Sequence, residues 1–194
     1  CGGNSGITFT TGATQTATGT SSFTWSTHGW TSRVPLPQDD VVISNAFSAS
    51  QTVTLDMPRC GKSIGFTGAT GSPTLGVAVA TSNHGSLTLI SGMTFTQSNT
   101  WTFEGRGSHT LTSAGKSFTT SVNFSAFGGT YTLADAFSHT TGGAFTINNG
   151  TFSDAGFSIS TRSFNSSNAN TRTITLTGTF TNTGTLACMS MGTI

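Results

Sequence analysis

The chain has 194 residues, of which only 7% are charged, and its formal net charge is +1. About a quarter of the residues in a typical soluble globular protein are charged, so helices laced with salt bridges cannot cover this surface. The Lys and Arg residues stand singly, whereas a surface that neutralises nucleic-acid phosphates needs them clustered. The composition therefore argues against nucleic acid as a partner and favours a single all-β domain rich in Thr, Ser and Gly.

Residues 1–40 differ from the rest of the chain, because they are rich in Thr and Gly and then carry Trp and Pro. The residues that mark this segment are Trp25, Trp30, Pro35, Asp39 and Asp40. The first coil of a solenoid exposes a sheet edge and an apolar end, which two Trp side chains and a Pro-stiffened loop can cover. We therefore predict that residues 1–40 form an N-terminal cap.

The chain has three cysteines, Cys1, Cys60 and Cys188, so at least one of them stays unpaired within the chain. An oxidising compartment favours one internal bridge with a free thiol, or a bridge between neighbouring subunits. Cys1 is followed by a Gly-rich stretch, residues 2–6, and this start resembles a mature bacterial lipoprotein with a lipidated Cys and a flexible tether. The alternative is that Cys1 is an ordinary thiol or one half of a disulfide.

Residues 41–194 repeat one local theme, a short strand followed by a turn rich in Gly, Asn or Ser. Apolar residues stand two apart with Thr or another small residue between them, which is typical of strands with one buried face. Such pairs include Val53/Leu55, Ile64/Phe66, Leu87/Leu89, Trp101/Phe103, Tyr131/Leu133 and Phe145/Ile147. We predict that this segment contains the repeats of a β-solenoid.

The turns favour a parallel coil over antiparallel hairpins. Two-residue hairpin loops prefer Asn-Gly or Asp-Gly, and only Asn149-Gly150 has that form. Gly-Thr-aromatic triplets that begin at Gly129, Gly150 and Gly178 recur about one coil apart. Isolated phenylalanines are predicted to stack in the interior; they are Phe118, Phe137, Phe152, Phe164 and Phe180. The predicted fold class is all-β, a right-handed parallel β-helix with an N-terminal cap, and a β-sandwich or jelly roll is the alternative.

Several segments resemble those of a known group of proteins. The segments are Trp25 to Trp30, Val34-Pro35, residues 39–43 and residues 53–56, and later residues 110–118 and 129–137. The pattern W…W…VP…DDVVI…VTLD resembles the opening of secreted bacterial and phage β-helix proteins, and the later runs are similar to repeats of phage-associated surface proteins. The resemblance implies a fibre, spike, decoration or adhesin role, with no catalytic residues to carry over.

The six acidic residues are Asp39, Asp40, Asp56, Glu104, Asp135 and Asp154. Glycoside hydrolysis requires two carboxylates that face one sugar, and Asp135 and Asp154 are placed to stack on adjacent coils. Both stand beside turn residues, where Asp commonly caps its own backbone, and we favour that structural role. Asp39 and Asp40 are likewise interpreted as turn-capping residues, since Ca²⁺ takes six or more oxygen ligands. We therefore predict no catalytic residues.

Metal and cofactor motifs are not found. The histidines are His28, His84, His109 and His139. They lack the spacing of a zinc site, and no two cysteines have Cys-x-x-Cys spacing. No phosphate-binding Gly-rich motif occurs either, so the sequence predicts no metal and no cofactor.

Runs in which Thr alternates with another residue indicate ice binding as a further alternative function. The runs are Thr8-Phe9-Thr10, Thr94-Phe95-Thr96 and residues 171–177. Flat ladders of Thr on a sheet would order surface water in the manner of β-solenoid ice-binding proteins. Trp101 would offer a flat face for sugar rings if its strand turned it outward, although core filling is the favoured fate.

The leading hypothesis is a non-enzymatic, extracellular structural or adhesive β-solenoid of a virion fibre, surface appendage or filament. We expect it to self-associate at a cell or virion surface, with a cell-surface glycan as a further partner. No apolar run approaches the roughly 18 residues that crossing a bilayer requires, so no membrane span is predicted. The alternatives are a β-helix that binds or processes polysaccharide, and an ice-binding protein with Thr ladders.

Overall fold

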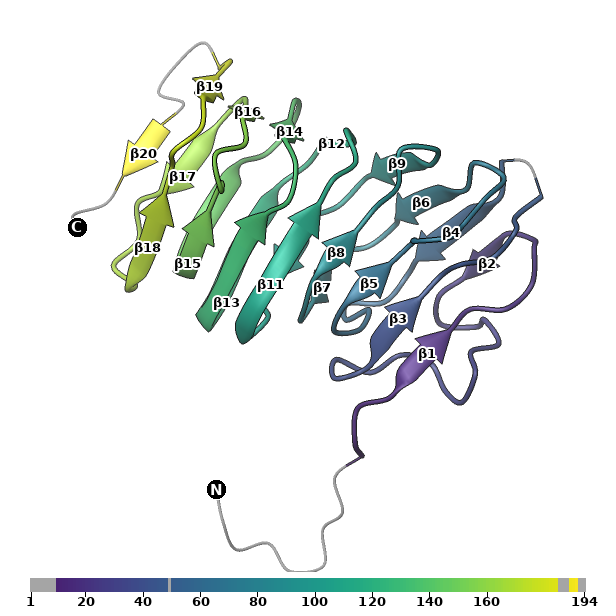
Figure 1. The fold of residues 1–194 in the computed structure, drawn as a ribbon. Coiled ribbons are helices and arrows are strands. Elements are labelled where there is room, and N and C mark those ends of the chain that lie inside the picture. The colour runs from purple at the N-terminus through teal and green to yellow at the C-terminus, as the bar shows by residue number, and fades with distance from the viewer. Residues whose placement is uncertain (1–9, 49, 185–188, 192–194) are drawn as a thin grey trace, which may run out of the picture.

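The computed structural model describes residues 10–48, 50–184 and 189–191, which form a stack of about eight coils (Figure 1). Every pairing between the named strands is parallel, and no helix occurs among the described residues. The predicted all-β parallel solenoid is therefore confirmed. The sandwich alternative is wrong, because a sandwich or jelly roll is built from antiparallel strands.

Each coil has three sides, and the strands of successive coils lie beside one another on each side (Figure 1). Side 1 contains β1 (Thr14–Thr16), β3 (Asp40–Val42), β5 (Ile64–Gly65), β8 (Leu87–Thr88), β11 (Gly107–Thr112), the second halves of β13 (Val122–Leu133) and β15 (Phe145–Ser153), and β18 (Arg172–Thr175). Side 2 contains β2 (Phe23–Thr24), β4 (Thr52–Leu55), β6 (Thr74–Val77), β9 (Thr94–Gln97), β12 (Ser117–Phe118), β14 (Phe137–His139), β16 (Ile159–Thr161) and β19 (Phe180–Asn182). Side 3 contains β7 (Thr81–Asn83), β10 (Trp101–Phe103), the first halves of β13 and β15, β17 (Phe164–Ser166) and β20 (Met189–Met191).

The length of a coil follows from the contacts between coils. Hydrogen bonds between neighbouring coils join residues 18 to 30 positions apart, as from Trp101 to Asn83 and from Ser26 to Asp56. Thr52, Thr74 and Thr94 therefore lie side by side on side 2. Because side chains alternate between the two faces of each strand, the residue that follows each Thr on β4 and β6 points into the core, as predicted from the period of two.

The core is a column of stacked aromatic rings. Phe103 and Phe124 stack with ring centroids 4.7 Å apart, and Phe124 lies 4.9 Å from Phe152. The predicted interior positions of Phe118, Phe137, Phe152 and Phe164 are confirmed, since all four are buried. Phe180 packs against this cluster but is only partly buried. Such pairs contribute about 0.5–1.5 kcal/mol each beyond the area they bury, so they hold coils together.

The Gly-Thr-aromatic triplets do not all stack. Tyr131 and Phe152 are in register, as predicted for the first two triplets. The prediction is wrong for the third triplet, because Phe152 faces Ile174 while Phe180 pairs with Ile159 on side 2. The third triplet is displaced from side 1 because Ile174 already occupies the position one coil above Phe152.

Residues 10–40 contribute strands to the stack and also bind the outer edge of β1. β1 and β2 pair with β3 and β4 in the same parallel arrangement as later coils. The backbone N–H of Thr16 donates to the Thr31 hydroxyl over 3.0 Å, and the N–H of Thr18 donates to His28 Nε2 over 3.0 Å. Trp25, Trp30, Pro35 and Asp39 are buried within this segment. The capping role stays a prediction.

Among the residues that the structure describes, there is no helix of the length and apolar character that crossing a membrane requires.

Candidate binding surface

The carboxylates singled out for glycoside hydrolysis bind the backbone of neighbouring coils. Asp154 is buried and accepts hydrogen bonds from the N–H groups of Thr177 (2.9 Å) and Gly178 (2.9 Å). Asp135 accepts from the N–H groups of Ser113 (2.8 Å) and Ala114 (2.5 Å). Asp154 also caps its own turn, as predicted, because it accepts from the Gly156 N–H over 3.0 Å. Asp135 instead binds the turn of the preceding coil, so the prediction that it caps its own backbone is wrong. Each carboxylate joins two neighbouring coils.

The electrostatics of Asp154 follow from this arrangement. Burial raises the pKa of this carboxyl, but the N–H groups of Gly156, Thr177 and Gly178 and the Thr177 hydroxyl outweigh burial, so the pKa lies below its ordinary value. The group is therefore held as a carboxylate whose oxygens are already occupied. A general acid needs the opposite arrangement, a raised pKa and an oxygen free to reach substrate.

Asp39 and Asp40 face different partners. Asp39 is buried and forms a two-pronged ion pair with Arg33, whose Nη2 lies 2.6 Å from Oδ1 and whose Nε lies 3.0 Å from Oδ2. Asp39 also accepts from the N–H groups of Ala13 and Leu36, whereas Asp40 lies 3.4 Å from Lys62 Nζ. Within residues 10–48, 50–184 and 189–191, no group of three or more His, Cys, Asp or Glu side chains is placed to hold a metal.

The histidines occupy separate places in the fold. His139 is buried, with Nε2 3.0 Å from the Thr120 carbonyl and Nδ1 3.0 Å from the Thr161 hydroxyl. His109 Nε2 lies 2.8 Å from the Arg106 carbonyl. His84 lies 3.9 Å from Glu104, and His28 stacks on Phe23 with centroids 3.7 Å apart. His139 and His109 therefore bind local backbone or hydroxyl groups, whereas the buried His84 Nε2 makes no hydrogen bond to any residue that the structure describes.

The cysteines cannot all be placed. Cys60 is buried, its Sγ donates to the Ser82 carbonyl over 3.2 Å, and burial raises the pKa of the thiol to about 12. This thiol therefore stays protonated at neutral pH and is enclosed by the core. Cys1 and Cys188 lie outside the described residues, so pairing between them, and a lipid on Cys1, stay predictions.

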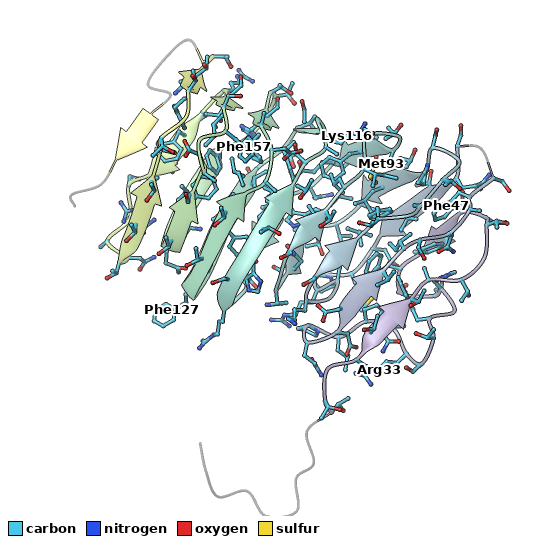
Figure 2. The ribbon with its side chains drawn as sticks, in the orientation of Figure 1. Arg33, Phe47, Met93, Lys116, Phe127 and Phe157 are labelled. Carbon is cyan, nitrogen blue, oxygen red and sulfur yellow. The ribbon has the colours of Figure 1, made fainter. Side chains whose placement is uncertain are left out.

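Two Phe side chains of the described chain are exposed: Phe127 lies within β13, where the pairing with β15 is irregular, and Phe157 follows the turn after β15. Trp101 is fully buried and its Nε1 donates to Asn83 Oδ1 over 2.9 Å, so the sugar-stacking alternative for Trp101 is wrong. Phe127 and Phe157 are 69% and 39% exposed and project near opposite ends of the side 1 strands (Figure 2). Arg106 lies over the Phe127 ring at 5.8 Å. The outer surface of side 1 between Phe127 and Phe157 carries small polar side chains instead.

Four consecutive coils of side 1 carry hydroxyl side chains at the same two outward positions. These residues, which we call the hydroxyl ladder, are Ser108, Thr110, Thr130, Thr132, Thr151, Ser153, Thr173 and Thr175. One column runs from Ser108 to Thr173 and the other from Thr110 to Thr175, across β11, β13, β15 and β18 (Figure 1). The residue between the two columns points inward in each coil, as Tyr131 does.

Of the Thr runs identified in the sequence, only one contributes to this ladder, and it lies at the C-terminal end. Residues 171–177 supply Thr173 and Thr175, but Thr94 and Thr96 lie on β9 of side 2, and Thr8 lies outside the described residues. The missed signal is a hydroxyl-x-hydroxyl triplet that recurs about one coil apart. It could not be isolated in a chain so rich in Thr, because the register between coils decides which triplets align.

Most of the ladder hydroxyls are unbonded to the residues that the structure describes. Some Thr hydroxyls elsewhere bind backbone carbonyls, as Thr120 does to Asn99 (2.6 Å) and Thr81 does to Met57 (2.8 Å), whereas others, such as Thr54 and Thr74 on side 2, are unbonded to these residues like those of the ladder. Within the described part of the chain, the hydroxyls of six ladder residues make no hydrogen bond. These six residues are Ser108, Thr130, Thr132, Thr151, Thr173 and Thr175. They remain available to bind something outside the molecule.

Fold and surface together define a parallel β-solenoid with a hydroxyl-lined side. No protein-family model, curated protein or solved structure matches the chain.

Proposed function

We propose that this chain is a non-enzymatic structural or adhesive module, part of a fibre, spike or appendage on the outside of a cell or virion. The observation that carries the proposal is the way acidic side chains are used. Asp56, Asp135 and Asp154 each bind backbone amides on a neighbouring coil. Carboxylates committed to joining coils support a rigid rod, which is what a fibre or spike requires.

The stack has one end that supports association with a second copy. Among the described strands, β18 pairs only with β15 and β19 pairs only with β16. Ile174 and Phe180 on these strands are only partly buried, whereas Phe152 and Ile159 one coil earlier are buried. An open strand edge beside partly covered apolar side chains is a template for adding another strand.

Light scattering of the full chain across a range of concentrations tests self-association, and electron microscopy shows the shape of the particles. We expect rod-like assemblies whose mass grows with concentration. Ile174→Lys places a charge at the open end and should reduce the assembled mass, while Thr96→Lys on side 2 should leave it unchanged. A monomeric mass at every concentration, or equal loss in both folded variants, would refute association through this end.

A further inference from the structure

The hydroxyl ladder has a two-dimensional repeat. Parallel strands lie about 4.8 Å apart, and residues two positions apart on one strand are separated by about 6.6 Å. The strand registers keep these positions aligned through four coils, so hydroxyl-bearing side chains recur at both spacings. A ligand that matches this surface must itself be a lattice with repeats of similar size in two directions.

No charged side chain occupies any of the eight ladder positions. Arg172 stands just before the ladder on β18, but its guanidinium donates to the carbonyls of Asn168 (2.7 Å) and Asn170 (2.8 Å). The Asp154 carboxylate is turned inward onto the backbone of Thr177 and Gly178. The ladder positions are therefore uncharged, which suits a neutral lattice, and the exposed Arg106 stands two residues before Ser108, outside the ladder.

The combination of hydroxyl and methyl groups points to water. Each ladder Thr offers one free hydroxyl, which bonds directly to ordered water, and one methyl group, around which first-shell water is orientationally restricted. A crystalline polysaccharide would instead be recognised by aromatic faces, and the exposed rings of Phe127 and Phe157 lie outside the ladder.

We propose that the hydroxyl ladder is an ice-binding surface, on which two columns of Ser and Thr from four coils hold water in an ice-like lattice. This inference goes beyond the proposed structural role and does not depend on self-association.

The other two sides lack an equally regular surface. On side 2, Thr54 and Thr96 belong to one column, but Gly76 interrupts it. On side 3, the outward positions alternate hydroxyls with amides, as in Thr102 beside Asn123. Side 2 therefore supplies control positions with the same side chains but without the full repeat.

The test compares two folded double variants of the full chain. Thr132→Lys with Thr151→Lys changes adjacent coils in the centre of the ladder, and Thr54→Lys with Thr74→Lys makes the same diagonal change on side 2. All four residues lie on strands and are partly buried, so the two variants are matched in burial and secondary structure. The measurements are thermal hysteresis and the shape of single ice crystals in solutions of the purified protein.

We expect hysteresis and faceted crystals with the unaltered chain and with the side 2 variant, and loss of both with the ladder variant. If the Lys substitutions unfold the ladder, Thr132→Ser with Thr151→Ser keeps the hydroxyls and should still lower hysteresis, because the methyl groups are lost. Round crystals with the unaltered chain, or equal losses in the two Lys variants, would overturn the proposal. Ladder-dependent binding to microcrystalline cellulose or chitin without hysteresis would also overturn it and assign the surface to polysaccharide.

Discussion

The acidic residues considered as catalytic candidates have structural roles here. Asp154 shows how much one such carboxylate contributes to the free energy of unfolding. Its carboxylate receives several backbone N–H donors while buried, so removing its charge leaves those donors facing a weaker acceptor. Asp154→Asn should lower the free energy of unfolding by about 2 kcal/mol, the usual value of hydrogen bonds to a charged group. Urea denaturation measures the loss.

Asp40→Asn is the control for Asp154→Asn, because the Asp40 side chain is 46% exposed and lies 3.4 Å from Lys62 Nζ. An exposed pair contributes less than about 1 kcal/mol. Because the Asp154 pKa is lower in the folded chain, its contribution is present above its ordinary pKa of 3.8 and is lost as the pH falls through the folded value. Equal losses in the two variants would contradict a special role for Asp154.

His139 gives the fold a second pH dependence. Burial lowers the pKa of this ring below 6.5, although the Thr120 carbonyl opposes the shift. The unfolded chain therefore binds a proton more readily, so stability should fall as the pH drops below 6.5 and continue to fall until the folded pKa is passed.

His139→Gln should flatten this pH dependence. Denaturant midpoints measured well above and just below pH 6.5 check the effect. His84 and His28 have pKa values lowered in the same direction but are less enclosed, so part of the slope should remain. A slope identical to that of the unaltered chain would show that His139 is not responsible.

At the level of strands and turns, local alternation was predictable and register was not. Trp101 and Phe103 are both buried because the inward side of a strand depends only on its own backbone. Which residues lie side by side depends on the lengths of three turns per coil, and these vary. Hence the sequence correctly aligned Tyr131 with Phe152 but wrongly continued to Phe180, and it missed most of the hydroxyl ladder.

Gly150 lies within β15 and packs closely against the neighbouring coil. Its φ is +80°, and an added Cβ would lie 2.1 Å from the Ala126 carbonyl oxygen of the neighbouring coil. Gly107 has φ +89° but nothing within 4 Å of an added Cβ. Gly107→Ala should cost about 1 kcal/mol of backbone strain, and Gly150→Ala about 1–3 kcal/mol more, because the backbone it meets cannot move easily. Chemical denaturation of both variants measures the difference, and equal costs would show that the close approach is relieved.

At the scale of the whole molecule, each coil contacts only its neighbours, so stability should spread along the stack in one dimension. Phe124 lies at the centre of the aromatic column, in contact with Phe103, Tyr131, Phe145 and Phe152. Truncating a buried Phe to Ala typically costs about 3–5 kcal/mol. Phe124→Ala should therefore weaken the link between the coils on either side and separate unfolding into two transitions.

Phe180→Ala tests the same one-dimensional behaviour from the end of the stack. Phe180 is partly buried and its ring contacts Phe164 at 5.4 Å, so its loss should loosen the coil of β18 and β19. Hydrogen exchange should then quicken in β16 and β19 while β4 and β6 keep their protection, because stability along a stack is lost locally. The Phe124 variant should quicken exchange on both sides of the break. Uniform loss of protection along the chain in both variants would mean that the coils unfold as one cooperative unit.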